Sequence, residues 1–354
     1  MKKWLSICLT VVLMTVAIPS AFAADSTEGI TLDSYFPVDV EGHWASDVLN
    51  DFVQAGVLKG YDVDGEVYLK PNDSVTRAEF VTILLRAVDP AAPGTPKDNT
   101  FTDVKKSDWY YSTVIEANSL GIVNGVDATH FAPNGKITRA EISAILSRFF
   151  NATVQFNGSA AAFNDISGYW AEEDIEKLSK AGIASGYKDG GFHPKATATR
   201  AEAATFLNRS IHLESTQIPE DSVLVDLVKQ YNQEQYDAFK NGAFDLMQSS
   251  IESHEVGFSK DLELLSVEQL KAYKDMGLTM EVTMNGEMNG QVTFKSDRYA
   301  IVKMTGGTIE VKISQGSNSY TTSTAGDDTY YLRKTQDGWK IYSTANEYSE
   351  TAQF

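Results

Sequence analysis

Three segments of this chain share one spacing of apolar positions, which becomes visible when Trp44, Trp109 and Trp170 are aligned. Apolar residues lie five and eight positions after each tryptophan, and this spacing places them on one face of a short helix. They are Leu49, Val114 and Ile175 at the first position and Phe52, Ala117 and Leu178 at the second. A glycine lies twelve positions after each tryptophan, where it suits the left-handed residue that ends a helix.

A second helix is predicted in each segment, because Thr76, Thr138 and Thr199 each precede a glutamate by three positions. This arrangement is a capping box, which begins a helix. The apolar positions that follow are Phe80, Ile83 and Leu84 in the first copy and Ile142, Ile145 and Leu146 in the second. Each unit is therefore helix, loop, helix. Because one unit is too small to bury its own apolar face, we expect the three to pack about a shared core.

The tetrapeptide Thr-Arg-Ala-Glu begins each of these second helices and places Arg77, Arg139 and Arg200 in the first turn. The positive end of the helix dipole lies there and disfavours a cation. The repeated arginine therefore indicates an anionic partner, either a bound ligand or a carboxylate of a neighbouring repeat. A second set of arginines is expected to be structural, because a cation late in a helix suits the dipole. This set is Arg86, Arg148 and Arg209.

The repeat ends near residue 212, and three further helices are predicted after a connecting segment at 213–221. An amphipathic pattern runs from Val223 to Lys240, and a shorter one covers residues 242–251. The third helix is expected between Ser266 as its cap and Gly277 as its end.

The apolar period then changes to two, which predicts strands. The predicted strands are 279–284, 291–295, 299–304, 308–314, 318–322, 329–334 and 339–343. The last two are joined across Asp337-Gly338, a strong hairpin signal. Helices followed by a run of antiparallel strands predict an α+β domain over residues 222–354.

Charge and the N-terminus restrict where the protein acts. The sequence has 30 Lys and Arg against 48 Asp and Glu, so its formal net charge is −18, which argues against nucleic acid as a partner. Residues 1–23 have a basic start, a short apolar run and an Ala-Phe-Ala end, the pattern of a secretory signal peptide. A membrane anchor is the alternative, but the apolar run is short for a spanning helix. The single cysteine, Cys8, lies inside this segment.

No catalytic signature is found in the sequence, and we expect no enzyme activity, no cofactor and no metal. There is no G-x-S-x-G, H-E-x-x-H or Walker loop. His254 is expected to be structural or exposed, and Asp261 and Asp327-Asp328 to be surface charges. Trp339 and Tyr342 are expected in the core. The loop at residues 62–69 lacks the glycine and closing glutamate of a calcium-binding EF-hand.

Three stretches resemble the S-layer homology (SLH) repeat. They contain the motifs GVLKGYDVDGEVYLKPNDSVTRAEF, GIVNGVDATHFAPNGKITRAEI and GIASGYKDGGFHPKATATRAEA. We place the repeats at 33–90, 100–150 and 162–212. The resemblance implies an all-α module with pseudo-threefold symmetry on the surface of a Gram-positive bacterium. It also implies that grooves between the repeats bind an anionic secondary cell-wall polysaccharide, in many members a pyruvylated one.

The resemblance suggests nine polysaccharide-binding residues. The arginines of the tetrapeptide would bind a ligand carboxylate, helped by free N–H groups of the helix N-terminus. The alternative for these arginines is a salt bridge between repeats. The tryptophans would stack on sugar rings or fill the core, and the glycines would admit a ligand or only serve turns. The nine residues are Arg77, Arg139, Arg200, Trp44, Trp109, Trp170, Gly60, Gly125 and Gly186.

The order of helices followed by strands, and the closing stretch YLRKTQDGWKIYS, resemble the NTF2-like fold over about residues 222–346 of the C-terminal domain. In that fold a curved sheet wraps around an N-terminal helix. The leading hypothesis is a secreted protein anchored to the cell wall that displays this domain, whose own partner the sequence does not identify. No membrane insertion is expected after signal cleavage. Two alternatives stay open: a wall-attached enzyme with its active site in a C-terminal pocket, and a structural S-layer subunit.

Overall fold

The computed structural model describes residues 32–90 and 98–346. The predicted signal peptide and Cys8 lie outside these residues. Among the helices of the described residues, none is both long and apolar enough to span a membrane.

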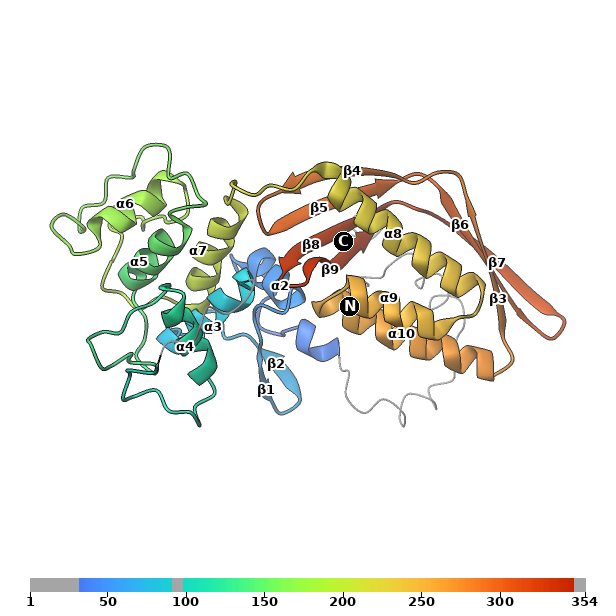
Figure 1. The fold of residues 1–354 in the computed structure, drawn as a ribbon, viewed down its shortest axis with the longest axis horizontal. Coiled ribbons are helices and arrows are strands. Elements are labelled where there is room, and N and C mark those ends of the chain that lie inside the picture. The colour runs from blue at the N-terminus through green and yellow to red at the C-terminus, as the bar shows by residue number, and fades with distance from the viewer. Residues whose placement is uncertain (1–31, 91–97, 347–354) are drawn as a thin grey trace.

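The helix–loop–helix units predicted from the sequence are confirmed (Figure 1). The first helices of the units are α2 (Ser46–Gln54), α4 (Tyr111–Ser119) and α6 (Glu172–Lys180). The second helices are α3 (Arg77–Val88), α5 (Arg139–Phe150) and α7 (Arg200–His212). Repeat 1 also has a short 3-10 helix, η2 (Leu32–Tyr35), and a hairpin of β1 (Tyr61–Val63) and β2 (Glu66–Tyr68). The glycines that end the first helices have left-handed backbones, as expected, with φ of 70°, 70° and 71°.

The three units close into a ring through their backbones. The residue before each capping threonine, Val75, Ile137 or Ala198, is buried and donates its N–H to the carbonyl of another member of this trio. Val75 donates to Ala198, Ala198 to Ile137, and Ile137 to Val75. A closed cycle of three equivalent bonds requires all three repeats, so the shared core predicted from the sequence has a pseudo-threefold axis.

The C-terminal domain has the predicted order of helices followed by strands. Its helices are α8 (Asp221–Lys240), α9 (Phe244–His254) and α10 (Gly257–Asp275). Its strands are β3 (Thr279–Asn285), β4 (Asn289–Lys295), β5 (Tyr299–Thr305), β6 (Thr308–Gln315), β7 (Asn318–Ala325), β8 (Asp328–Thr335) and β9 (Gly338–Asn346). The predicted start of the third helix is wrong. Ser266 lies inside α10 and donates its hydroxyl to the carbonyl of Leu262.

The strands form two antiparallel sheets, ordered β3-β6-β7 and β4-β5-β8-β9. Figure 1 shows α8, α9 and α10 over the second sheet, and the first sheet extending away from the repeats. The four-stranded sheet packs on the helices with one face and on the repeats with part of the other. Val302, Leu332 and Ile341 face the helices, whereas Tyr299 and Tyr342 belong to the core of the repeat module.

The two halves of the chain are held together by polar contacts. Arg333 of β8 donates to the carbonyls of Ala55 and Arg86, at 2.5 and 2.7 Å. The predicted connecting segment is also fixed in place. In it, Thr216 and Gln217 donate to the carboxylate of Asp297. The C-terminal domain is therefore docked on the repeats and not merely tethered to them.

Candidate functional site

The second helix of each repeat begins with the predicted capping box. In α5, the backbone N–H of Glu141 donates to the hydroxyl of Thr138 at 3.2 Å, and the glutamate accepts the N–H of Thr138 in return. The next free N–H groups, of Arg139 and Ala140, donate to carbonyls of the third repeat. The same contacts recur at the starts of α3 and α7. The prediction that these helix N-termini offer free N–H groups to an anion is therefore wrong, because neighbouring loops occupy them.

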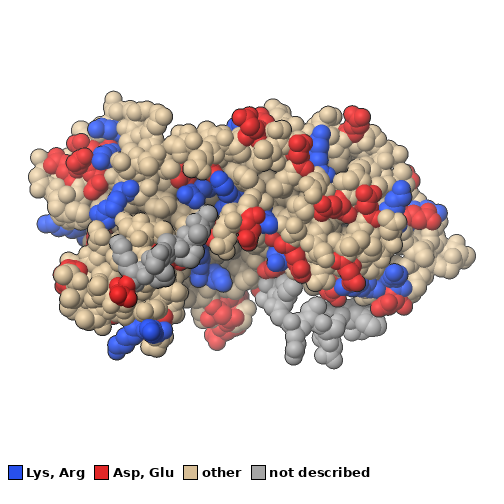
Figure 2. Space-filling view, in the orientation of Figure 1, with Lys and Arg blue, Asp and Glu red and all other residues tan. Residues whose placement is uncertain are grey.

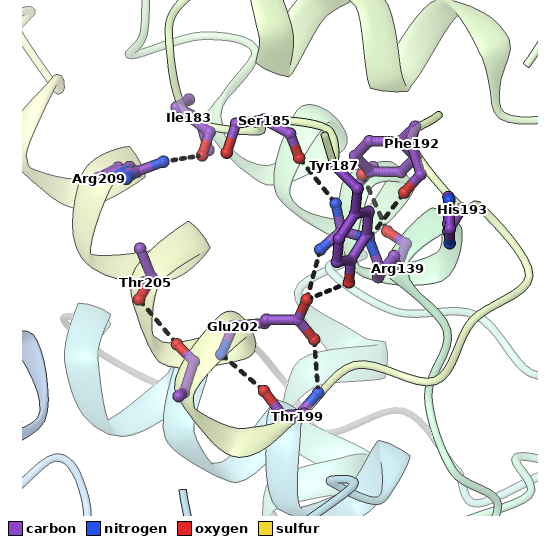
Figure 3. A network of polar contacts seen from close by, with 12 residues as sticks. Arg139, Ile183, Ser185, Tyr187, Phe192, His193, Thr199, Glu202, Thr205 and Arg209 are labelled. Atoms are coloured by element: carbon purple, nitrogen blue, oxygen red, sulfur yellow. Dashed lines mark hydrogen bonds and ion pairs between the residues drawn. The ribbon is translucent and has the colours of Figure 1, made fainter. Parts of the chain in front are cut away.

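The arginine of each tetrapeptide is buried at the junction with the next repeat. Arg77, Arg139 and Arg200 are only 7%, 2% and 6% exposed to solvent. Around Arg139 (Figure 3), Nε donates to the carbonyl of Phe192 at 2.9 Å and Nη2 to that of Ser185 at 2.8 Å. Its Nη1 bonds to the carboxylate of Glu202 at 2.9 Å. Its guanidinium also lies 4.5 Å from the ring centre of Phe192.

The glutamate of the next tetrapeptide is therefore the anionic partner of each arginine. Nη1 lies 2.9 Å from the glutamate in two junctions and 3.7 Å in the third. The pairs are Arg77–Glu141, Arg139–Glu202 and Arg200–Glu79. The alternative of a salt bridge between repeats thus accounts for the anion that the sequence requires. A direct contact with a ligand stays a prediction.

An aspartate that was not identified from the sequence helps to position each arginine. It binds the backbone of the loop whose carbonyl accepts a hydrogen bond from the arginine. Asp165 accepts the N–H groups of Phe192 and His193, each at 2.8 Å. This fixes the carbonyl of Phe192 toward Arg139 and holds His193 at a φ of 59°, a conformation that non-glycine residues seldom adopt. Asp39 and Asp103 do the same in the other repeats. The available signal was an aspartate five or six positions before each aligned tryptophan.

The three candidate glycines lie where a side chain would not fit. A Cβ at Gly186 would come within 2.6 Å of the carbonyl oxygen of Gly191. At Gly125 it would clash with the carbonyl of Asp127, and at Gly60 with the side chain of Val67. Backbone contacts thus require glycine at Gly125 and Gly186, in line with the turn alternative, whereas at Gly60 the side chain of Val67 would have to move. Close approach of a ligand to these residues stays a prediction.

The three tryptophans lie at the surface. Trp44, Trp109 and Trp170 are 64%, 62% and 62% exposed, so the alternative in which they fill the core is wrong. Each indole packs on the aromatic ring next to it in the sequence, with centroids 5.2–5.9 Å apart. Each of the three repeats therefore exposes one indole to solvent at the equivalent position.

The three junctions are not equivalent. Tyr61 and Tyr187 donate hydrogen bonds to Glu79 and Glu202, at 2.6 and 2.5 Å. Burial and this hydrogen bond raise the pKa of both tyrosines. Repeat 2 has Val126 at the corresponding position, so the Arg77–Glu141 junction has no such tyrosine. A basic side chain, Lys70 or His193, also lies over the tyrosine in the other two junctions.

Other residues singled out in the sequence are placed as follows. His254 of α9 contacts the carbonyl of Ser250 at 3.0 Å, which supports a structural role. Tyr342 is in the core as predicted, and Trp339 is partly buried. The prediction that Asp328 is a surface charge is wrong, because this first residue of β8 is only 1% exposed. The described residues contain no group of three or more His, Cys, Asp or Glu side chains that could hold a metal ion.

Acidic and basic side chains are mixed on the side of the molecule seen in Figure 2. Together with the net charge of −18, this is unlike a nucleic-acid-binding surface.

Residues 38–81, 100–142 and 162–204 match the model of the S-layer homology domain. An amylopullulanase of Thermoanaerobacterium thermosulfurigenes is 34% identical over 178 residues, which are 48% of this chain and 9% of that protein. The surface-layer 125 kDa protein of Lysinibacillus sphaericus is 32% identical over 205 residues, 54% of this chain and 17% of that protein. A cellulosome-anchoring protein of Acetivibrio thermocellus is 32% identical over 178 residues, 47% and 39% respectively. The chain thus spans less than half the length of each of these relatives.

Two solved structures align with about a third of the chain. They are the intermembrane space region of the chloroplast protein ARC6, at 17% identity and a TM-score of 0.29, and a putative NTF2-like dehydratase of Streptomyces avermitilis, at 15% and 0.24. They cover 36% and 35% of this chain and 95% of each of those chains.

Proposed function

Because three S-layer homology repeats lie between residues 38 and 204 of this chain, we propose that the protein attaches non-covalently to the bacterial cell surface by binding a cell-wall polysaccharide. Two similar proteins are named as a surface-layer protein and a cellulosome-anchoring protein, which supports a location at the cell surface. The repeats supply the attachment, and the docked C-terminal domain is displayed. We propose no catalytic activity for the chain.

The observation that carries this proposal is the exposure of one indole in every repeat. A tryptophan that is more than 60% exposed adds little to the core, and every repeat has one at the equivalent position. An indole offers a flat apolar face to a sugar ring and one N–H donor to its hydroxyls. Three repeats that engage one polymer would also add avidity to modest single contacts.

The finer proposal is that the polymer is anionic and pyruvylated, as the SLH resemblance implies. The buried arginines are already paired, whereas Lys70 beside Tyr61 and His193 beside Tyr187 are more exposed basic groups, of which His193 also pairs with Asp189. Repeat 2 offers Ala132 and Val126 at these positions. We therefore propose that the two junctions with a tyrosine bind the polymer more tightly than the junction of Arg77 with Glu141.

Sedimentation with purified cell-wall sacculi tests the attachment. The parent is compared with the triple variant Trp44→Ala, Trp109→Ala, Trp170→Ala, and walls stripped of their secondary polymer serve as the control. A matched variant, Leu246→Ala, removes an apolar side chain that is 64% exposed on α9 of the other domain. We expect the parent and Leu246→Ala to pellet with intact walls only, and the triple variant to stay in solution while keeping the parent's circular dichroism.

Equal pelleting of the parent with intact and stripped walls would exclude the secondary polymer as the ligand. Equal pelleting of the triple variant and the parent on intact walls would exclude the indoles as the contact. Comparison of pyruvylated with depyruvylated polymer then tests the finer proposal, which requires weaker binding to the depyruvylated form.

A further inference from the structure

A cavity of about 200 Å³ lies where the repeats meet the C-terminal domain. Helices α2 and α7 form one side, and the face of the four-stranded sheet opposite its own helices forms the other (Figure 1). The cavity opens to solvent beside Asp47. It is distinct from the junctions between repeats and exists only because the two domains are docked. Nothing in the proposed wall attachment uses it.

The carboxylate of Asp51 is the central polar group of this cavity. The hydroxyl of Tyr342 donates to its Oδ1 at 2.6 Å, and the side-chain amide of Asn208 donates to its Oδ2 at 3.3 Å. A carboxylate can accept about four hydrogen bonds, so these two leave it able to accept a ligand donor. Burial raises the pKa of Asp51, chiefly because the charged form loses hydration. A cationic ligand would restore the lost stabilisation of that charge.

Aromatic rings form most of the remaining wall. The ring of His212 lies 5.1 Å from that of Phe294 and 5.2 Å from that of Tyr299, and Tyr331 lies 6.2 Å from Tyr342. His212 bonds through Nδ1 to the carbonyl of Asn208, which fixes the ring in the wall. Aromatic faces attract an organic cation, and the attraction strengthens when the cation is desolvated.

The buried hydroxyl of Tyr299 gives a second indication of an absent partner. Tyr299 lines the cavity, is 2% exposed, and its hydroxyl has no hydrogen-bond partner among the described residues. Buried hydroxyls are normally satisfied, so an unpaired one at a cavity requires an explanation. A bound molecule with both polar and apolar parts, or water beside it, would supply one.

We propose that this cavity binds a small molecule or side chain that carries a protonated primary amine, with the ammonium paired to Asp51 and its carbon body against the aromatic wall. Asp47 at the mouth and Asp51 inside favour a cation over the wall polymer's carboxylates, and the positive groups near Asp51 are His212 and Arg333. The volume is below the roughly 300–1,000 Å³ typical of pockets for drug-sized ligands. This size suits an amino sugar or the end of a lysine side chain.

Isothermal titration of the full mature chain tests the ligand class. The probes are glucosamine, its neutral counterpart N-acetylglucosamine, and Nα-acetyl-lysine amide. We expect at least one amine to bind and N-acetylglucosamine not to bind. Comparison of the two amines distinguishes a sugar from a peptide source. Absence of binding by both amines at tens of millimolar, or equal binding of the neutral sugar, would overturn the ammonium proposal.

Three variants test the location. Asp51→Asn keeps the oxygen that accepts from Tyr342 and removes the charge, so we expect the amine's affinity to fall at least tenfold. Val48→Phe fills the cavity from α2 without changing charge and is expected to abolish binding. Asp47→Asn also removes one negative charge, but at the exposed mouth of the cavity. It should weaken binding by less than Asp51→Asn. Thermal unfolding of each variant checks its fold. Parent-like affinity in folded Val48→Phe would place the amine elsewhere.

Discussion

At the scale of single residues, the arginine of each tetrapeptide is explained by a carboxylate of the next repeat. Arg139 is unfavourable in the first turn of α5 taken alone, because the helix dipole repels it. Next to Glu202 and two carbonyls, the same residue makes three side-chain hydrogen bonds across the junction. Its identity therefore follows from assembly of the repeats, whether or not a ligand also contacts it.

Removal of this arginine is expected to destabilise the fold strongly. Arg139→Ala leaves the carboxylate of Glu202 and two carbonyls without their partner, and breaking a buried ion pair in this way costs about 3–5 kcal/mol. Arg148→Ala, an exposed position near the end of the same helix, is the matched control and should change stability by less than about 0.5 kcal/mol. Urea unfolding followed by circular dichroism measures both.

A double-mutant cycle with Glu202→Gln isolates the pair's own contribution to the free energy of unfolding. Additive effects would mean that the ion pair carries no coupling. If Arg139→Ala kept the parent's stability and lost wall binding, the arginine would be a ligand contact instead of a structural one.

At the scale of elements, the loops of the repeats are held in conformations that their residues do not favour. Lys70, Ala132 and His193 each have a positive φ, of 52°, 58° and 59°, immediately after the residue whose carbonyl accepts an arginine Nε. The aspartates behind them fix these residues by accepting their N–H groups. The loops thus keep a left-handed residue because the arginine contact requires that turn of the backbone.

Replacement of Ala132, the residue with a positive φ in repeat 2, by glycine is expected to stabilise the protein. Ala132→Gly removes the steric penalty of about 1–2 kcal/mol that an L-residue has in the left-handed region. The greater conformational entropy of glycine in the unfolded chain offsets part of this gain. We expect a net gain of about 0.5–1 kcal/mol. Ala272→Gly, exposed inside α10, should lose about 1 kcal/mol. Midpoints of thermal unfolding measure both, and a fall in midpoint for Ala132→Gly would contradict the strain argument.

At the scale of the whole molecule, the C-terminal domain and the repeats share one interface that is both apolar and polar. Tyr299 and Tyr342 pack into the core of the repeats, and Arg333 and Arg298 donate to carbonyls of repeat 1. Arg298 also pairs with the buried Glu214 at 2.7 Å. A domain bound by this many buried contacts is presented at a fixed angle to whatever the repeats bind.

Docking of this kind predicts cooperative unfolding of the two halves. Calorimetry of the parent should give one transition, with equal calorimetric and van't Hoff enthalpies. Arg333→Ala leaves the carbonyls of Ala55 and Arg86, one buried and one partly buried, without this donor, at a cost of about 2–4 kcal/mol. We expect this variant to unfold in two steps at lower temperature. Lys334→Ala, at the next position of β8, is the control and should retain one transition. Two separate transitions in the parent would show that the halves are independent.

Features that depend only on neighbours along the chain are predictable from the amino-acid sequence. Capping boxes, helix-ending glycines and the period-two strands are local, so the helices of the repeats and all seven strands of the C-terminal domain were predictable within a few residues. Features that depend on distant residues follow from the packing of the folded chain. Gly257 begins α10 at a position packed against the backbone of Gln54, a contact that no local pattern encodes. For the same reason the burial of Asp328 was missed.

The candidate site was also predictable only in part. The positions of the arginines, tryptophans and glycines were readable because they recur at fixed offsets. Their surroundings were not, because the partner of Arg139 is Glu202, 63 residues away, and comes close only when the ring of repeats closes. Likewise, the cavity at Asp51 needs residues from both domains. Local propensity acts along the chain, whereas ion pairs, burial and cavities depend on which distant surfaces meet.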